Sequence, residues 1–155
     1  MATKYDAGIG SEIIRSFGAR PEMLVQILHG FLERYRCVPR EAVPQIADEL
    51  NLSRADVHGV VSFYHDFRAQ PPGDTVIRIC QAESCQAMGS RALTEYARET
   101  LGIDFHETTA DGKVTLEPVY CLGNCACSPA LMVNDRVHGR VNREAFDRII
   151  AHHGA

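Results

Sequence analysis

The amino-acid sequence predicts an α+β protein in which a segment of three helices precedes a small α/β domain. Two observations lead to this prediction. Before residue 68, hydrophobic residues recur at helical three- and four-residue intervals. After residue 74, short runs rich in β-branched residues alternate with helical patterns, as they do in α/β domains. The sequence AQPPGD at residues 69–74 separates the two halves, because its prolines and glycine interrupt a helix.

These patterns divide the chain of 155 residues into four segments. We expect an N-terminal arm at residues 1–19, a helical bundle segment at 20–68, a linker at 69–74 and the α/β domain at 75–155. A chain of this length, with 45% hydrophobic residues, can bury a sizeable core. Fibrous and disordered classes are therefore excluded.

Three helices are predicted before the linker. Residues 21–36 (PEMLVQILHGFLERYR) place hydrophobic side chains along one face, after a proline suited to a first turn. Residues 41–50 (EAVPQIADEL) form a second stripe, whose early proline costs little because first-turn amides lack helical partners. The third helix begins at Ser53, which stands three residues before Asp56 as in a capping box.

Strands and helices alternate after the linker. Residues 75–80 (TVIRIC), 113–119 (KVTLEPV) and 130–135 (ALMVND) are short and rich in apolar or β-branched side chains, which predicts strands. One helix is predicted at 90–102, closing on a glycine, and another after Asn142, which can cap it. The order of strand, helix, strand, strand, helix, with the last two strands as a hairpin, is typical of a thioredoxin-like domain with one open sheet.

Composition narrows the range of partners and compartments. The chain has 16 Lys and Arg against 20 Asp and Glu, for a net charge of −4, with no basic stripe that could displace counterions from nucleic acid. No apolar stretch approaches the roughly 20 residues that span a bilayer. The start MATKYDAGIGSE lacks the layout of a signal peptide. We expect a soluble, cytoplasmic protein that binds no nucleic acid and has no membrane span.

The chain has six cysteines, which are its candidate functional residues, and five of them follow residue 79. In a reducing cytosol they are expected to be ligands or redox groups rather than disulfides. Cys80 and Cys85 form a C-x4-C pair, and Cys121 and Cys125 form a C-x3-C pair, each in a loop after a predicted strand. Neighbouring strands would bring both pairs together, giving four thiolates around one centre.

Four thiolates suit either a tetrahedral zinc ion or an iron–sulfur cluster. Zinc modules commonly use C-x2-C, whereas the longer loops here are suited to a wider [2Fe-2S] cluster with two thiolates on each iron. Small residues nearby would let backbone amides reach the sulfurs; they are Ala82, Ser84, Ala87, Gly89, Gly123, Ala126 and Ser128. A structural zinc module and a thiol oxidoreductase remain alternatives, although thioredoxin-type exchange uses a C-x2-C that is absent here.

Two runs of the sequence resemble a known family. VHGVVSFYHDFRAQPPGDTVIRICQAESC and VYCLGNCACSPALMVND are similar to the thioredoxin-like [2Fe-2S] ferredoxin subunits, which include the 24 kDa subunit of respiratory complex I, over roughly residues 20–150. The most specific parts are the Phe63–Tyr64 pair, the C-x4-C and the C-L-G-x-C-x-x-x-P motif. The resemblance implies that Cys80 and Cys85 bind one iron of a single [2Fe-2S] cluster, and Cys121 and Cys125 the other.

Within this family, QAESCQAMGS and TLEPVYCLGNCACSP most resemble the gamma subunit of NAD-dependent formate dehydrogenases. That resemblance implies an electron-transfer subunit without independent activity, in a complex that couples formate oxidation to NAD+ reduction. FMN and NAD would bind a neighbouring flavin subunit, and molybdopterin a large subunit. The equivalent subunit of complex I (NADH:quinone oxidoreductase) or of an NAD-reducing hydrogenase is the alternative.

Other cysteines and histidines have simpler explanations. Cys127 could replace Cys125 on spacing alone, but the family motif favours Cys125, and Cys127 can pack as a small hydrophobic residue. Cys37 lies far from both pairs and is predicted to be structural. His106 and His138 could give Rieske-type ligation, which four well-placed cysteines make unnecessary.

The aromatic pair Phe63–Tyr64 has two interpretations. The pair could end a helix in the core, or it could form an edge that docks onto a partner subunit. No carboxylate pair, Ser-His-Asp set or phosphate-binding glycine loop accompanies the cysteines. We therefore predict no catalytic residues in this chain.

Overall fold

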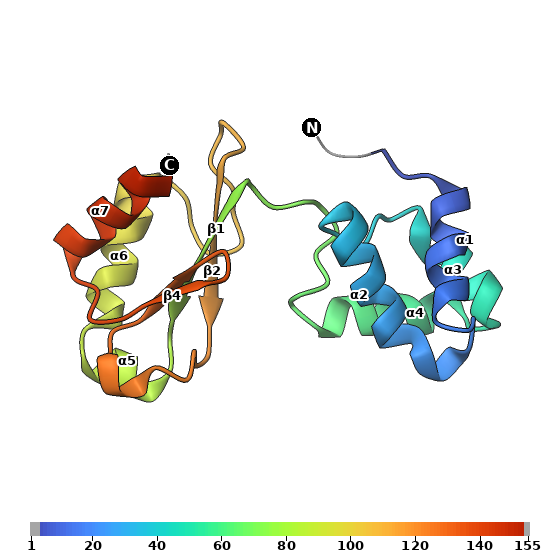
Figure 1. Ribbon diagram of the computed structural model, residues 1–155, viewed down its shortest axis with the longest axis horizontal. Helices are drawn as coiled ribbons and strands as arrows, with labels where there is room; N and C mark the ends of the chain where they lie inside the picture. Colours follow the sequence, from blue (N-terminus) through green and yellow to red (C-terminus); the bar gives the residue numbers. More distant parts are fainter. Residues whose placement is uncertain (1–3, 154–155) are drawn as a thin grey trace. The chain divides into compact units, whose positions relative to one another are not determined.

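The computed structural model describes residues 4–153 (Figure 1). The chain forms two compact units, which divide between Pro71 and Pro72. The N-terminal unit is helical, and the C-terminal unit is built on a four-stranded sheet. None of the helices in residues 4–153 is long and apolar enough to cross a lipid bilayer.

The three helices predicted for the N-terminal unit are confirmed. They are α2 (Leu24–Tyr35), which follows a 3-10 turn η1 (Pro21–Met23), then α3 (Ala42–Leu50) and α4 (Arg54–Phe63). The capping box of α4 forms as expected, because the Asp56 amide donates to Ser53 Oγ and the Ser53 amide donates to the Asp56 carboxylate. Helix α3 ends at Leu50, because the next residue, Asn51, adopts a left-handed backbone conformation.

A fourth helix, α1 (Ala7–Ser16), lies in the segment that the sequence predicts to be an arm. Its glycines lower helix propensity, so no helical pattern stands out in the sequence. Gly10 is needed by the packing, since a Cβ there would lie 2.6 Å from the Tyr5 hydroxyl and 2.9 Å from Gln45 Oε1. Asp6 caps the helix by accepting from the Ile9 amide. Tertiary packing therefore stabilises a helix that local propensity does not predict.

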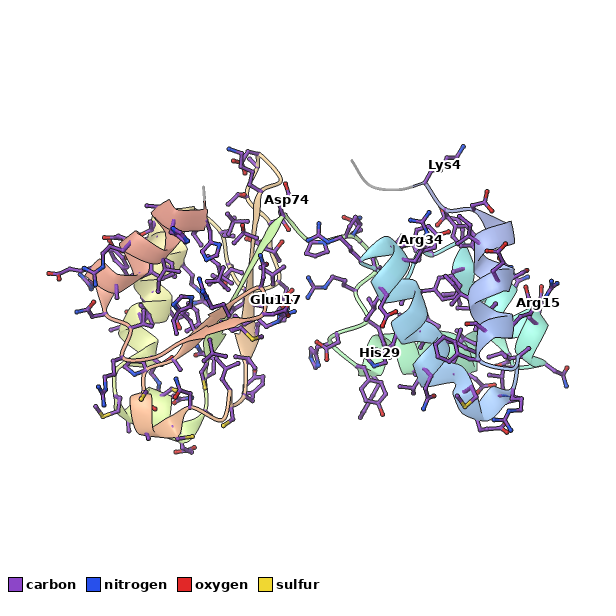
Figure 2. The ribbon with its side chains drawn as sticks, in the orientation of Figure 1. Lys4, Arg15, His29, Arg34, Asp74 and Glu117 are labelled. Carbon is purple, nitrogen blue, oxygen red and sulfur yellow. The ribbon has the colours of Figure 1, made fainter. Side chains whose placement is uncertain are left out.

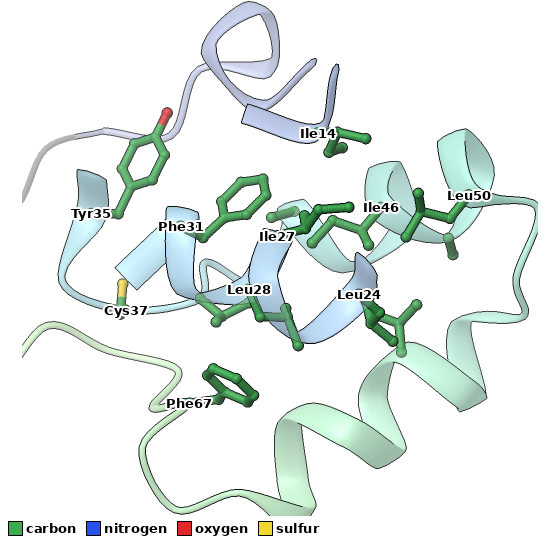
Figure 3. Close-up of a cluster of buried hydrophobic side chains, with 14 residues drawn as sticks. Ile14, Leu24, Ile27, Leu28, Phe31, Tyr35, Cys37, Ile46, Leu50 and Phe67 are labelled. Carbon is green, nitrogen blue, oxygen red and sulfur yellow. The ribbon is translucent and has the colours of Figure 1, made fainter. Parts of the chain in front are cut away.

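The core of the N-terminal unit consists of side chains from all of its helices (Figure 3). Phe31 of α2 is fully buried at its centre, and its ring stacks on that of Tyr35. Cys37 lies at the edge of the same core and is 6% exposed. The predicted structural role of Cys37 agrees with this position among hydrophobic side chains.

The C-terminal unit contains a mixed sheet of order β2-β1-β3-β4. Along the chain its elements are β1 (Thr75–Cys80), α5 (Glu83–Ala87), α6 (Ser90–Leu101), β2 (Val114–Val119), the 3-10 turn η2 (Cys125–Cys127), β3 (Leu131–Val133), β4 (Arg136–His138) and α7 (Arg143–His153). The thioredoxin-like fold predicted from the sequence is confirmed, with α6 and α7 side by side on one face of the sheet (Figure 1).

The strand pairing differs from the prediction in one respect. The strands predicted at 113–119 and 130–135 do not form a hairpin, because β1 lies between them, parallel to β2 and antiparallel to β3. The hairpin is instead β3–β4, with Asn134 at φ 51° in its turn. Strand β4 has three residues and α5 has five, so neither is long enough to show a periodic pattern in the sequence.

The pairing of β1 and β2 positions the two cysteine pairs. Their parallel register sets Cys80 opposite Val119, so both strands end at the same edge of the sheet. Helix α6 packs against β1, and the sheet residues facing it, such as Ile77 and Leu116, are almost fully buried. The loops that follow both strands therefore start from a rigid, closely packed base.

Candidate metal centre

Four cysteines come together at the edge of the sheet where β1 and β2 end. Cys80 is the last residue of β1, and Cys85 lies on the short helix α5 that follows. Cys121 comes two residues after β2, and Cys125 begins η2. The structure thus brings together the four cysteines that the sequence pattern selects.

The first pair is buried. Cys80 and Cys85 are each 2% exposed and pack with Ala130 in a small apolar core between the two loops. Their thiols are hydrogen-bonded to each other. The Ser90 hydroxyl donates to the Cys80 carbonyl and so fixes the backbone at the end of β1.

The second pair is exposed. The sulfur atoms of Cys121 and Cys125 lie 3.7 Å apart, and both residues are solvent-exposed. Cys121 adopts φ 118°, which is strained for a residue with a side chain. The Gly123 amide donates to Cys121 Sγ over 3.3 Å. The loop therefore directs one backbone donor at its own first sulfur.

The sulfur–sulfur distance of the exposed pair fits two ligands of one metal ion. A tetrahedral metal with bonds of about 2.3 Å to sulfur holds two sulfurs about 3.8 Å apart, close to the 3.7 Å between Cys121 and Cys125. Residues 4–153 contain no group of three or more His, Cys, Asp or Glu side chains arranged to hold a single metal ion. A [2Fe-2S] cluster takes two thiolates on each iron, and the Cys121–Cys125 pair has the spacing that one tetrahedral iron requires.

Burial and hydrogen bonds shift the pKa values of the two buried thiols in opposite directions. Burial raises the pKa of Cys80, while the amides of Ala82 and Leu122 donate to its sulfur and oppose the shift. Burial acts on Cys85 too, but hydrogen bonds with the Ser128 hydroxyl, the Ala130 amide and the Cys80 thiol outweigh it and lower the pKa of Cys85. The protein thus provides donors for anionic sulfur inside an apolar site.

The two pairs also interact electrostatically. The hydrogen bond with Cys121 raises the pKa of the Cys125 thiol, and the charge of Cys121 raises it further. Charge on Cys85 and Cys80 adds to the same effect. Four thiolates this close repel one another, so the site favours a cationic group that neutralises them.

Sequence reasoning missed one part of this site. Ser84 and Ser128 were expected only to be small, yet their hydroxyls lie 2.9 Å apart and link the two cysteine loops. Ser128 Oγ lies 3.4 Å from Cys85 Sγ. Cys85 and Ser128 are 43 positions apart along the chain, so no local pattern predicts their contact.

The remaining cysteines occupy different surroundings. Cys127 ends η2, and its Cβ and carbonyl lie against Gly139. Hydrogen bonds or charge interactions link the thiols of Cys80, Cys85, Cys121 and Cys125 to one another. Cys37 belongs to the other unit.

The two histidines considered for Rieske-type ligation lie in different surroundings. His106 Nδ1 lies 2.7 Å from the carboxylate of Glu117 on β2, which is labelled in Figure 2. Burial lowers the pKa of His138, with smaller effects from Arg136, His153 and His152. His106 is thus paired with a carboxylate, whereas His138 Nε2 is buried without a hydrogen-bond partner among the described residues.

The aromatic pair at the end of α4 is not part of the core. Phe63 is 73% exposed and Tyr64 is 46% exposed, so the interpretation of Phe63 as a core residue is wrong. Tyr64 packs edge-on against both Phe63 and the buried Phe67. In the C-terminal unit, Tyr120 is similarly exposed, at 76%, directly beside Cys121.

A thioredoxin-like fold with two cysteine pairs at one sheet edge defines a class of iron–sulfur proteins. The chain belongs to the thioredoxin-like [2Fe-2S] ferredoxin family, whose model matches residues 10–153. The cofactor of this family is one [2Fe-2S] cluster, which fits the paired sulfurs and their donors. Membership of this family confirms the cofactor predicted from the sequence.

Two curated relatives show what kinds of protein this chain resembles. It is 40% identical over 113 residues to an NADH-quinone oxidoreductase subunit of Pseudomonas aeruginosa, covering 73% of this chain and 68% of the relative. It is 31% identical over 140 residues to the HndA subunit of the NADP-reducing hydrogenase of Solidesulfovibrio fructosivorans, covering 90% of this chain and 82% of the relative.

A solved structure supports the fold. An NAD+-reducing [NiFe]-hydrogenase chain in the air-oxidised state aligns with a TM-score of 0.70 at 22% identity, covering 85% of this chain. This chain spans only 23% of that hydrogenase chain. At this identity the similarity establishes the shared fold and nothing more.

Proposed function

We propose that this chain is an electron-transfer subunit of an NAD(P)-linked oxidoreductase complex of the complex I or NAD-reducing hydrogenase type. The observation that carries the proposal is the presence of two thiol pairs at one sheet edge, in a chain that is 40% identical to a complex I subunit over 113 residues. The bound cluster supplies a centre that accepts and donates one electron at a time. Binding and positioning this centre are the tasks of the chain.

The ligand set is part of this proposal. Cys80 and Cys85 bind one iron, and Cys121 and Cys125 bind the other. The donors found at Cys80, Cys85 and Cys121 support this assignment, because hydrogen bonds to anionic sulfur stabilise a ligating thiolate. Cys127 is assigned no ligand role.

The two pairs have different tasks in this proposal. Cys80 and Cys85 anchor the centre in the apolar space between the loops and exclude water from that side. Cys121 and Cys125 leave the opposite side open to solvent. An exposed edge shortens the distance to a redox group on another protein, so we infer that electrons are exchanged there.

The partners are proposed from the relatives. A complex I or hydrogenase assembly would provide a neighbouring subunit with the flavin and the nicotinamide site. The exposed Phe63 and Tyr64 offer an apolar surface that can dock onto it. We propose a cytoplasmic location, because a reducing compartment keeps cysteine ligands from forming disulfides.

The formate dehydrogenase assignment is the second candidate. The motifs around Cys85 and Cys125 favour it, whereas the relatives named above belong to complex I and to hydrogenases. A molybdopterin-containing partner is specific to this candidate. Co-purification of the full chain with its native partners distinguishes the two, since molybdenum or tungsten and formate-dependent NAD+ reduction occur only with formate dehydrogenase.

The test of the basic proposal is metal analysis with electron paramagnetic resonance of the anaerobically purified chain. We expect two irons and two sulfides per chain, with a signal that appears only on reduction by dithionite. One zinc and no iron would contradict the proposal and favour a structural zinc module. Metal-free protein with a titratable disulfide would favour a thiol oxidoreductase.

Serine substitutions test the ligand set. Cys80→Ser, Cys85→Ser, Cys121→Ser and Cys125→Ser should each lose the cluster or change its spectrum, because a hydroxyl is a poorer ligand for iron than a thiolate. Cys127→Ser is the matched control for Cys125→Ser and should leave the spectrum unchanged. The reverse result for this last pair would refute the assignment of Cys125.

A further inference from the structure

Two serine hydroxyls connect the buried cysteine pair to the exposed one. Ser84 lies beside Cys85 on α5, and Ser128 follows η2. Ser128 Oγ lies 3.4 Å from Cys85 Sγ and 2.9 Å from the Cys125 carbonyl oxygen. Ser84 Oγ lies 3.2 Å from that same carbonyl and 2.9 Å from Ser128 Oγ. Ser128 is 8% exposed, so water has little access to its hydroxyl.

The number of protons limits how these contacts can be used. Each hydroxyl donates one hydrogen bond, while the Cys125 carbonyl and a thiolate at Cys85 can only accept. If Ser128 donates to the carbonyl, its oxygen lone pairs face the anionic sulfur of Cys85 at 3.4 Å. If Ser84 donates to the carbonyl instead, Ser128 is free to donate to the sulfur. The second arrangement satisfies both acceptors.

Energetics favour this second arrangement once Cys85 is a ligand. A hydrogen bond to an ionised acceptor is roughly twice as strong as one between neutral groups. Cys85 is 2% exposed, so its charge depends on protein donors rather than on water. The Ser128 hydroxyl should therefore donate to the Cys85 sulfur rather than to the Cys125 carbonyl.

We propose that Ser128 donates a hydrogen bond to the Cys85 thiolate and raises the reduction potential of the cluster, while Ser84 holds the Cys125 carbonyl and leaves Ser128 free to do so. The inference rests on the ligand set proposed above. Reduction adds negative charge to the cluster, which a donor at a ligand sulfur stabilises. Ser128 and Ser84 are positioning residues, and neither is a ligand.

The arrangement predicts a particular order of potentials. Ser128→Ala should shift the potential of the full chain to a more negative value. Ser84→Ala should give a smaller shift in the same direction, because Ser128 then divides its proton between the Cys125 carbonyl and the Cys85 sulfur. The double variant should match Ser128→Ala, since Ser84 acts only through Ser128.

The experiment is a redox titration of the purified full chain, followed by electron paramagnetic resonance. Ser84→Thr retains a hydroxyl at a partly exposed position and should restore the wild-type potential. Ser62→Ala is the control, because Ser62 lies in the other unit, where its hydroxyl donates to the Gly59 carbonyl. Resonance Raman spectra provide a second readout: the iron–cysteine stretching modes should move to higher frequency in Ser128→Ala, as the sulfur loses a donor.

Several results would overturn the inference. The first is an unchanged reduction potential in Ser128→Ala. The second is a reduction potential of Ser84→Ala that does not lie between those of the wild type and Ser128→Ala. The third is a double variant in which the two potential shifts add. If Ser128→Ala binds no cluster, Ser84→Ala still tests the inference against wild type. Absence of iron from the wild-type chain would instead refute the proposed cofactor role, and an unperturbed Cys85→Ser spectrum would refute the ligand set.

Discussion

Replacing Gly139 by alanine should displace the loop that carries Cys125. A Cβ at this position would lie 2.7 Å from Cys127 Cβ, 2.8 Å from the Cys127 carbonyl oxygen and 2.7 Å from Asn124 Nδ2. The amide of Asn124 can rotate away. Cys127 cannot, because its carbonyl accepts from the Arg140 amide at 2.6 Å, so the whole turn must shift.

The size of the effect follows from these contacts. Overpacking by one methyl group costs about 1–3 kcal/mol. For a domain of this size, each kcal/mol lowers the midpoint of thermal unfolding by roughly 4–8 °C. Because the displaced turn begins at Cys125, we also expect a changed electron paramagnetic resonance spectrum of the cluster.

The assay follows the visible absorption of the cluster during heating, which reports on the C-terminal unit. Gly59→Ala is the matched control, since nothing lies within 4 Å of a Cβ at Gly59 in α4. That control should stabilise the N-terminal unit by about 0.5–1 kcal/mol and leave the cluster unchanged. A Gly139→Ala protein with the wild-type midpoint and spectrum would refute the reasoning.

Three further predictions concern stability. Phe146→Ala, at a fully buried ring that packs edge-on against Tyr96, should cost about 3–5 kcal/mol in urea unfolding, and a loss below about 1 kcal/mol would contradict this. Asn142→Ala removes the acceptor for the Ala145 amide and should cost about 1 kcal/mol in the same assay, whereas an unchanged midpoint would exclude a capping role. Burial, followed by the charge of Tyr35, raises the pKa of Tyr5 from 10.0 to about 12. The neutral phenol is therefore favoured by folding, so this contribution to stability is complete below pH 10.0 and is lost as the pH rises from 10.0 to about 12. Helical circular dichroism during unfolding at several pH values should show this loss, and Tyr5→Phe should remove it; an identical pH dependence in Tyr5→Phe would rule it out.

Local patterns predicted most of the secondary structure, because they act over a few residues. The capping box at Ser53 and the cap at Asn142 form as the sequence indicates. Helix α6 ends at Gly102 in the left-handed conformation that glycine favours. Helix α1 was missed because its stability comes from packing against other helices, for which Gly10 has to be small.

The spacing of the cysteines by itself predicted two thiol pairs at one edge of the sheet, because each pair follows a strand and parallel neighbours end at the same edge. Spacing left Cys127 as an alternative to Cys125, which the family motif decided. Tertiary structure alone decided that Cys80 and Cys85 are buried while Cys121 and Cys125 are exposed. It also placed the Ser128 hydroxyl beside Cys85, across 43 positions of sequence. Burial and long-range hydrogen bonds depend on which segments pack together, and a linear spacing does not contain that information.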